Sequence, residues 1–348
     1  MALEPQVHAH ENLRRIRRQP IALSSETLVN AAPYDGSGHV LLVRPTISAV
    51  DLATWAGEQK EWIESRLATY GGILFRGFNV AGAAALDRIV AAVAGDPLAY
   101  KERSSPRRLV GGNVYTSTEH PPDQAIFPHN ENSYQHIFPR RVFFCCVTPA
   151  STGGQTPVTD VRRVFDRIDP AIRQRFIERR VLYVRNFGDG LGLPWQVVFQ
   201  TDDRSAVEEY CWNAGIKWTW RDGNRLTTRQ IRPAVARHPR TGEMVWFNHA
   251  TFFHVSTLPS SIRDALLSQF GEQDLPNNTY YGDGSPIEPG VLDELRAAYA
   301  EATRTFMWET GDLLLLDNML MAHAREPFTG PRSVLVSLAM PACWADFS

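Results

Sequence analysis

The spacing of hydrophobic residues predicts a mixture of helices and short strands over the first half of the chain. Between residues 48 and 70 the apolar positions mostly follow a helical period, and Gly71 and Gly72 end this pattern before the apolar run 73–76 predicts a strand. Residues 82–93 follow a helical period again. Further along, three apolar runs predict strands and two segments between the last two of them predict helices: strands at 141–147, 156–159 and 181–187, helices at 161–168 and 171–179.

Beyond residue 187 the pattern predicts mostly short strands joined by turns. The turns at 222–224 and 239–242 each lie between two apolar runs and predict two hairpins, 216–221 with 225–228 and 234–238 with 244–248. Near the C-terminal end three more runs predict strands, at 305–309, 313–317 and 333–340. We therefore expect a mainly β protein with peripheral helices, built as a closed or double-sheet architecture. A doubly wound sheet is excluded because strand and helix do not alternate through the second half.

The composition excludes several classes of partner. The chain has 348 residues with 36 Lys and Arg against 38 Asp and Glu, and no basic run longer than residues 14–18, so a nucleic-acid-binding surface is not expected. No apolar run approaches the roughly 20 residues that span a bilayer. Residues 1–8 carry charges and Pro where a secretion signal needs an apolar stretch, so we expect no export by that route.

The cysteines indicate a reducing environment. Cys145, Cys146, Cys211 and Cys343 show no C-x-x-C spacing, and the first two lie in the apolar run 142–147. Buried, reduced thiols are the expectation, and with them a cytoplasmic location.

His129 and Glu131 are the first candidates for metal ligands. Residues two apart on an extended chain project from the same face, so this imidazole and this carboxylate can bind one ion together. The pair alone is a weak signal, because a chain with 10 His and 38 acidic residues contains such a pair by chance.

His323 and Arg332 strengthen the interpretation. His323 follows the apolar strand 313–316, and two His with one carboxylate on one face of an ion form the facial triad of non-heme Fe(II) oxygenases. Arg332 begins the strand predicted at 333–340, where a guanidinium can bind a carboxylate with two hydrogen bonds. Taken singly, each His can equally be a hydrogen-bonded core residue and Arg332 a surface residue at a strand end.

With these residues in order, the chain resembles the taurine dioxygenase-like (TauD/TfdA) family of Fe(II)/2-oxoglutarate-dependent oxygenases. Within it the chain resembles the branch of amino-acid hydroxylases from peptide natural-product biosynthesis. The likeness covers most of the chain, and the order and spacing of the motifs carry it, since each motif alone is unspecific. The motifs are residues 72–78, 115–119, 128–134, 143–146, 153–157, 246–248, 311–312, 317–318 and 323–332.

The resemblance implies a fold, a metal and a cosubstrate. The implied fold is a double-stranded β-helix (jelly roll), with His129, Glu131 and His323 as Fe(II) ligands and O2 as oxidant. Arg332 and the hydroxyl of Thr156 are implied to bind the distal carboxylate of 2-oxoglutarate. Because the ligands must meet at one iron, we expect residues 1–348 to form a single oxygenase domain with helical insertions.

Two departures from the taurine enzyme narrow the expected reaction. Glu131 stands where that enzyme has Asp, as in the amino-acid-hydroxylating relatives, and related halogenases have Ala or Gly there, so halogenation is not expected. The position of the Arg that binds the sulfonate of taurine is Val336, which argues against sulfonate substrates.

The expected function is hydroxylation of an unactivated C–H bond of an amino acid, free or tethered to a carrier protein, in secondary metabolism. Asn132 and Arg185 are weak candidates for substrate contacts, and packing is the competing explanation for both. Desaturation, epoxidation or cyclisation at the same iron, and a non-catalytic jelly-roll binding protein, stay open as alternatives. No membrane partner is expected, and the sequence leaves open whether the chain forms a homo-oligomer.

Overall fold

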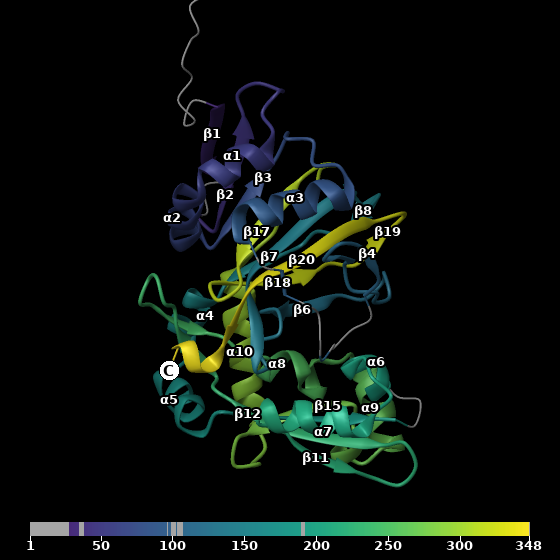
Figure 1. Cartoon of the computed structure of the whole chain (residues 1–348). Coiled ribbons are helices and arrows are strands. Elements are labelled where there is room, and N and C mark those ends of the chain that lie inside the picture. Colours follow the sequence, from purple (N-terminus) through teal and green to yellow (C-terminus); the bar gives the residue numbers. More distant parts are fainter. Residues whose placement is uncertain are drawn as a thin grey trace, which may run out of the picture.

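The computed structural model describes residues 28–34, 38–95, 97–98, 102, 107–188 and 192–347 (Figure 1). The expectations for residues 1–18 lie outside this part of the chain. The described elements form a sheet-rich, mixed α/β structure, with one large sheet in the upper half of Figure 1 and another in the lower half.

The largest sheet has eight strands in the order β1-β2-β3-β17-β7-β20-β5-β4. β2 and β3 are parallel, and the other neighbours are antiparallel. The strands are β1 (Val29–Pro33), β2 (Val40–Pro45), β3 (Gly72–Phe75), β4 (Leu109–Gly111), β5 (Val114–Thr116), β7 (Ile137–Thr148), β17 (Leu313–Asp317) and β20 (Ser333–Cys343).

Strand β17 lies inside this sheet and is apolar on both faces. Leu313 and Leu315 pack into one hydrophobic core, and Leu314 and Leu316 into another. Successive side chains of a strand point to opposite faces, so four consecutive leucines require cover on both sides.

Three helices cover the face of Leu313 and Leu315: α1 (Leu52–Glu58), α2 (Lys60–Tyr70) and α3 (Gly82–Ala94). Asp51 caps α1 by accepting a hydrogen bond from the backbone of Thr54 at 2.9 Å. Gly71 ends α2 in the left-handed conformation, with φ of 74°. The prediction of one continuous helix up to residue 70 was wrong, because the backbone of Gln59 is not helical and divides the segment into α1 and α2.

A four-stranded antiparallel sheet, β16-β9-β18-β6, lies on the side of Leu314 and Leu316. Val158 and Ala322 from this sheet share the core with those leucines. Its strands are β6 (Ile126–His129), β9 (Val158–Asp160), β16 (Thr303–Arg304) and β18 (Met321–Arg325), and the short pair β8 (Thr152–Gly153) and β19 (Phe328–Thr329) lies apart from it.

The lower half of Figure 1 holds a second four-stranded sheet in the order β11-β12-β10-β15. Its strands are β10 (Val181–Phe187), β11 (Lys217–Trp220), β12 (Leu226–Arg232) and β15 (Asn277–Tyr281). β11 pairs with β12, and β13 (Val235–Arg237) pairs with β14 (Met244–Trp246), which confirms both predicted hairpins. Helices α6 (Trp195–Phe199), α7 (Arg204–Asn213), α8 (Ala250–Phe253) and α9 (Ser260–Gln269) belong to this half.

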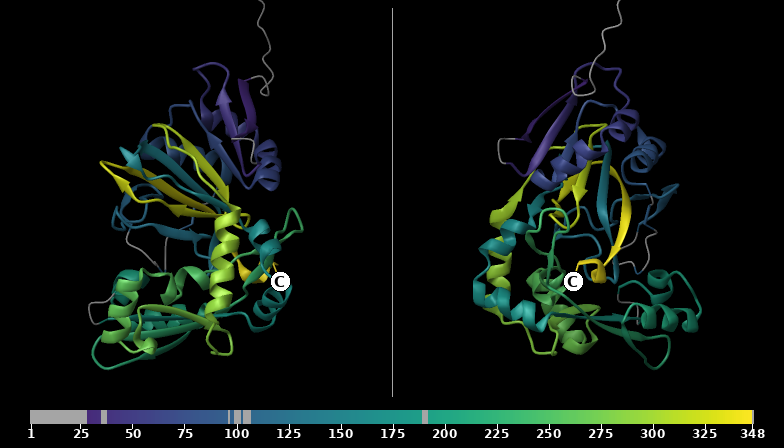
Figure 2. Two further views of the ribbon diagram at one scale, coloured as in Figure 1. Left: turned by 180° about the vertical axis from the view of Figure 1, so that it is seen from behind. Right: turned by 60° about the vertical axis from the view of Figure 1, so that its left-hand side comes forward.

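Two predictions for the second half were wrong. Strands were expected to dominate beyond residue 187, but the described residues there include five α-helices, α6 to α10. The longest of them, α10 (Pro289–Ala302), buries one face, and Figure 2 shows it running between the two halves. Residues 305–309 form no strand, although β16 precedes them. Phe306 and Trp308 are buried while Met307 is exposed, so an irregular segment shows the alternation of a strand.

The predicted helices at 161–168 and 171–179 are confirmed as α4 (Val161–Arg167) and α5 (Pro170–Arg179). Cys145, Cys146 and Cys211 are buried free thiols, as expected, and Cys343 is half-buried. Burial raises the pKa of Cys145 to about 11.

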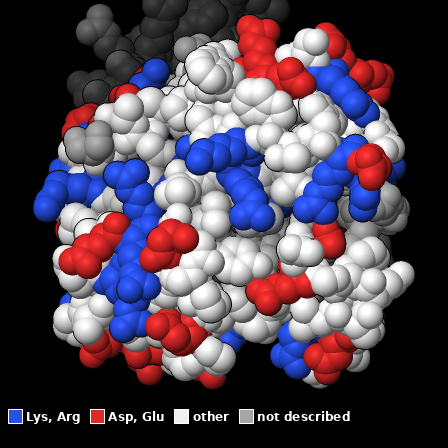
Figure 3. Space-filling model, turned by 90° about the horizontal axis from the view of Figure 1, so that it is seen from below, with Lys and Arg blue, Asp and Glu red and all other residues white. Residues whose placement is uncertain are grey.

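Within the described residues, no helix has the length and apolarity that a membrane crossing requires. On the face seen in Figure 3, basic and acidic side chains are interspersed, in keeping with the near-balanced charge.

Candidate active site

The structure brings His129, Glu131 and His323 together. His129 ends β6, and His323 lies opposite it in the adjacent strand β18. One ligand atom from each of the three residues lies within 4.8 Å of the others, a spacing at which they could hold one metal ion. The two histidines lie on neighbouring antiparallel strands and Glu131 lies in the turn just after β6, so residues far apart in the sequence meet at one site.

Hydrogen bonds and ring contacts orient these side chains. Nδ1 of His129 lies 2.9 Å from the carbonyl oxygen of Phe127. In the tautomer with the proton on Nδ1, this nitrogen donates to the carbonyl and Nε2 is left to bind a metal. The ring of Phe252 stacks on His129 with centroids 4.5 Å apart. The amide of Asn318 accepts from the backbone nitrogen of Glu131 at 2.7 Å and donates to its carbonyl at 2.9 Å. The protein itself therefore orients His129 and the backbone of Glu131.

The electrostatics suit a cation. Burial lowers the pKa of His129 to about 3, and nearby His323 adds to this, so the imidazole is neutral and ready to donate its lone pair. Burial alone would raise the pKa of Glu131, but Arg107 and His323 outweigh it and hold that pKa well below its usual range. Two histidines and one carboxylate are a ligand set that fits a divalent ion of the Fe(II) type.

Arg107 is a site residue that the sequence did not reveal. Its Nη2 lies 2.9 Å and 3.1 Å from the two carboxylate oxygens of Glu131, and both side chains are buried. Arg107 precedes β4 and has no motif or periodic spacing that relates it to Glu131 in the sequence.

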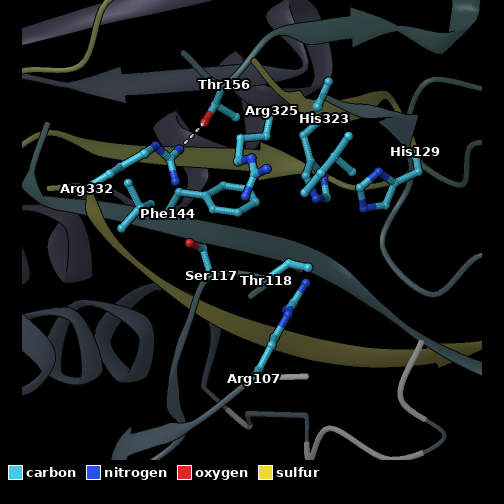
Figure 4. A pocket seen from close by; sticks show the side chains of 12 residues that line it. Arg107, Ser117, Thr118, His129, Phe144, Thr156, His323, Arg325 and Arg332 are labelled. Carbon is cyan, nitrogen blue, oxygen red and sulfur yellow. Dashed lines mark hydrogen bonds between the residues drawn. The ribbon is translucent and has the colours of Figure 1, made fainter. Parts of the chain in front are cut away.

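A small cavity of about 30 Å³ extends from the two histidines to Arg332 and Thr156 (Figure 4). Nη2 of Arg332 lies 3.4 Å from the Thr156 hydroxyl, which also accepts from the indole of Trp308 at 3.0 Å. Burial lowers the pKa of Arg332 to about 10, and the charge of Arg325 contributes. A desolvated guanidinium beside a hydroxyl at the end of a cavity is suited to bind a carboxylate.

Gly154 permits this arrangement. Its φ is +71°, and a Cβ atom there would lie 2.8 Å from Cβ of Ala150 and 3.1 Å from Cδ of Arg332. The Gly-Gly turn before Thr156 therefore lets Arg332 lie close to the backbone, where its Nε donates to the carbonyl of Gly154 at 3.0 Å.

A larger cavity of about 750 Å³ adjoins the same histidine. His129, Glu131 and Asn132 lie in its wall. The apolar and aromatic part of the wall comes from residues 125–127, α8, the segment that leads into α9, α9 itself and residues 275–276. Asn132, which the sequence suggested as a substrate contact, is buried and lines this cavity. Its backbone has a positive φ of 56°.

Arg185 is placed differently from the sequence expectation. Arg185 is not one of the described residues that line the two cavities. Its Nη1 lies 3.5 Å from the buried carboxylate of Glu102. Its guanidinium also contacts the ring of Tyr134 at 5.4 Å.

His249 is a second site residue that the sequence did not reveal. It lines the larger cavity, its ring lies 5.7 Å from that of His129, and its Nδ1 is 2.6 Å from the hydroxyl of Ser133. Burial lowers its pKa well below the usual value, so it presents a neutral ring to the cavity.

Comparison with known proteins places these features in a family. Residues 39–338 match the model of the "Taurine catabolism dioxygenase TauD, TfdA family". The chain is 38% identical over 306 residues to the dapdiamide synthesis protein DdaC of Enterobacter agglomerans, covering 88% of this chain and 92% of that protein. It is 32% identical over 294 residues to a clavaminate synthase-like protein of Arabidopsis thaliana, covering 80% of this chain and 84% of that protein.

Solved structures share the fold. PvcB of Pseudomonas aeruginosa matches with a TM-score of 0.55 and 18% identity over 91% of this chain and 93% of that chain. A second PvcB structure is described as an Fe, alpha-ketoglutarate dependent oxygenase from an isonitrile synthetic pathway, with a TM-score of 0.54 and 18% identity over 92% of this chain and 94% of that chain.

Proposed function

Because the chain belongs to the taurine catabolism dioxygenase TauD, TfdA family, we propose that it is an Fe(II)/2-oxoglutarate-dependent dioxygenase of natural-product biosynthesis. Its proposed reaction is hydroxylation of an unactivated C–H bond of an amino acid, free or presented by a carrier protein. The observation that carries the proposal is the cavity that links His129 and His323 to Arg332 and Thr156.

The proposed site has one role for each of these side chains. His129, Glu131 and His323 would hold Fe(II), which with 2-oxoglutarate and O2 supplies the chemistry of C–H oxidation. Arg332 and Thr156 would bind the distal carboxylate of 2-oxoglutarate at the far end of the small cavity. The neutral His129 and the ionised Glu131 present the protonation states that metal binding needs.

The fold proposed for this function is a double-stranded β-helix. The eight-stranded sheet and the sheet β16-β9-β18-β6 pack on a shared core. The two candidate histidine ligands lie in the smaller sheet, and Glu131 follows β6. We extend this proposal to one oxygenase domain over residues 1–348.

The large cavity supports a substrate bigger than one small amino acid. Cavities of about 300–1,000 Å³ enclose drug-sized ligands, and this one measures about 750 Å³. The relative named for dapdiamide synthesis and PvcB from an isonitrile pathway support a place in natural-product biosynthesis. A non-catalytic binding protein is not retained, since the family is one of dioxygenases.

Succinate formation tests the proposed function. Purified protein with Fe(II), 2-oxoglutarate and O2 is expected to form succinate, and His129→Ala or Glu131→Ala to abolish it while circular dichroism shows a retained fold. Full turnover in either variant would sink the assignment. With a substrate in hand, the product mass separates hydroxylation or epoxidation, which add one oxygen, from desaturation or cyclisation, which remove two hydrogens.

A further inference from the structure

Two buried polar side chains, Asn132 and His249, line the large cavity beside the candidate metal ligands. They are 3% and 2% exposed. Asn132 follows Glu131 directly in the chain, and the ring of His249 lies 5.7 Å from that of His129. His249 immediately precedes α8, which lies beside β6 (Figure 1). Both side chains therefore belong to the part of the cavity wall that adjoins the candidate metal site.

The side-chain amide of Asn132 has no hydrogen-bond partner within the described part of the chain. Only its backbone is engaged, where the carbonyl accepts from the backbone nitrogen of Gln135 at 2.9 Å. A buried amide without a partner is costly, and such a group is typical of a site that a ligand completes. In the cavity this amide can donate through Nδ2 and accept through Oδ1.

The backbone of Asn132 offers a competing explanation for this residue type. Its φ of 56° lies in the left-handed region, which Asn tolerates better than most residues. Asn79 has the same φ of 56°, yet it is exposed and lines neither of the two cavities. The backbone therefore explains an Asn in the turn after β6, but it does not explain why the amide is buried in a cavity wall.

The ring of His249 presents a hydrogen-bond donor to the cavity. Its Nδ1 lies 2.6 Å from the hydroxyl oxygen of Ser133, a fully buried residue whose hydroxyl has no other partner among the described residues. If Nδ1 donated, this buried O–H would lack an acceptor, so the arrangement in which Ser133 donates is favoured. Nε2 of His249 then carries the ring hydrogen and is left for a ligand in the cavity.

These two side chains match an amide better than a carboxylate. A secondary amide carries its C=O and N–H on opposite sides, so it can accept from Nε2 of His249 and donate to Oδ1 of Asn132. A carboxylate has no hydrogen for Oδ1, and neither side chain offers it a fixed positive charge. Arg107, which also lines the cavity, is already paired with the carboxylate of Glu131.

The surroundings strengthen the selectivity of such hydrogen bonds. The rings of Phe252 and Phe253 lie 5.3 Å and 5.0 Å from that of His249 and exclude water from one side of it. In an apolar wall, a ligand that leaves a buried polar group unpaired is strongly disfavoured. The cavity of about 750 Å³ also has room for groups on both sides of an amide.

We propose that Asn132 and His249 bind an amide group of the substrate beside the metal, so that the substrate is an amino acid in amide linkage and not a free amino acid. This inference rests on the proposed function and deepens it, because it names the substrate class. The amide has two possible sources: an N-acylated or peptide-like amino acid, or the pantetheine arm of a carrier-bound aminoacyl group.

A panel of amino acids tests the substrate class. Alanine, leucine, phenylalanine, aspartate and lysine, each free, as the N-acetyl N-methylamide and as the pantetheine thioester, are added anaerobically to protein loaded with Fe(II) and 2-oxoglutarate. The readout is the change in the metal-to-ligand charge-transfer absorption. At least one amide-bearing form should act at about tenfold lower concentration than its free amino acid. A response to the acetylated form places the amide on the amino acid, and a response to the thioester alone places it on the pantetheine arm.

An ester analogue tests the role of Asn132. In the compound that acts at the lowest concentration, oxygen replaces the amide N–H, and wild type should then need about tenfold more of it, because Oδ1 of Asn132 has no hydrogen to accept. Asn132→Gly, which keeps the left-handed backbone, should respond equally to amide and ester. Asn79→Gly is the matched control, since it makes the same change at the same φ away from the cavities, and it should keep the preference.

Two replacements of His249 test its donor. Both are made together with Ser133→Ala, so that no buried hydroxyl loses its partner, and Ser133→Ala alone is the reference. With His249→Leu the protein should need about tenfold more of the amide. With His249→Gln, which retains a side-chain N–H, the requirement should stay within a few-fold of the reference. Equal requirements in the Leu and Gln variants would remove His249 from the proposed pair.

Several results would overturn the inference. They are a free amino acid that acts at concentrations as low as its amides, no response to any amide-bearing form, an ester as effective as the amide in wild type, and a preference that survives in Asn132→Gly or is lost in Asn79→Gly. Absence of the charge-transfer absorption itself would instead contradict the proposed function.

Discussion

At the scale of single residues, the buried amide of Asn318 connects the end of β17 to the candidate metal ligands. It bonds to both backbone groups of Glu131 and donates to the carbonyl of Pro139 at 2.7 Å. The backbone carbonyl of Asn318 accepts from the side-chain amide of Asn130 at 2.6 Å. One side chain thus satisfies three backbone groups and sets the backbone on which the carboxylate is mounted.

We expect Asn318→Ala to impair the metal site more than its effect on stability alone would suggest. The change leaves three buried backbone groups without this partner, at a cost of about 1–3 kcal/mol each, and frees the backbone of Glu131. Mn(II) affinity should fall about tenfold or more. The control is Asn248→Ala, whose buried side-chain amide bonds to the backbone of Ala234 and Ala250. An equal loss of Mn(II) affinity in both variants would contradict this role of Asn318.

His254 gives a pH-dependent contribution to stability. Burial lowers its pKa to about 4, with a further effect of Arg296, and its Nδ1 accepts from the backbone of Ser256 at 3.1 Å at the start of the 3₁₀ helix Val255–Thr257. The unfolded chain takes up this proton near pH 6.5 and the folded chain only near pH 4. The contribution is therefore present above pH 6.5 and is lost as the pH falls toward 4.

We expect the free energy of unfolding of wild type to lose about 2 kcal/mol more than that of His254→Asn between pH 6.5 and pH 4. Asn can accept the same backbone hydrogen bond but does not titrate. Urea unfolding at several pH values measures the difference, and parallel pH profiles of the two proteins would rule out this assignment.

Among the site residues, His129, Glu131, His323, Thr156 and Arg332 could be proposed from the sequence because each lies in a motif of fixed order. Arg107 could not, since only the folded loop before β4 brings it to Glu131. Asn318 lay in a recognised motif, but its role depends on a turn that places it beside β6.

At the scale of elements, α10 closes the core between the two halves of the molecule. Pro289 occupies its first turn. Its buried residues recur at helical spacing and are Val291, Leu292, Leu295, Ala298, Tyr299 and Ala302. The helical signal was thus present in the sequence, and the strand-rich pattern around it hid it.

Leu295→Ala should destabilise the protein by about 2–5 kcal/mol, because it opens a cavity at a fully buried position in the main core. Glu301→Ala on the same helix removes an exposed ion pair with Arg167 and should cost less than about 1 kcal/mol. Denaturant unfolding compares the two. A cost for Leu295→Ala as small as that for Glu301→Ala would show that α10 is not part of the cooperative core.

Elements with a strong local signal were predictable, and those defined by distant contacts were not. β10 follows from its apolar run, and both hairpins follow from apolar runs joined by turn residues. Residues 305–309 alternate for a different reason, because Phe306 and Trp308 are both buried in the same large core without strand pairing.

At the scale of the whole molecule, the candidate site joins two distant parts of the chain, β6 with Glu131 and β18. Such a site exists only in the folded chain, so a metal that binds there stabilises the fold by mass action. The long sequence separation between these strands makes metal binding a reporter of global folding.

Saturating Mn(II) should therefore raise the melting temperature of wild type, corresponding to about 2.7 kcal/mol at a free concentration of 100 times Kd. Excess EDTA should reverse the shift, and Glu131→Ala should show none. Differential scanning calorimetry measures all three. A shift of equal size in Glu131→Ala would place the bound metal elsewhere.

The most direct test of the account is the charge-transfer absorption formed when Fe(II) and 2-oxoglutarate are added anaerobically. We predict that wild type develops this absorption, that Glu131→Ala does not, and that Arg332→Ala needs at least about tenfold more 2-oxoglutarate to reach it. No absorption in wild type, or an unchanged 2-oxoglutarate requirement in Arg332→Ala, would contradict the proposed iron and cosubstrate site.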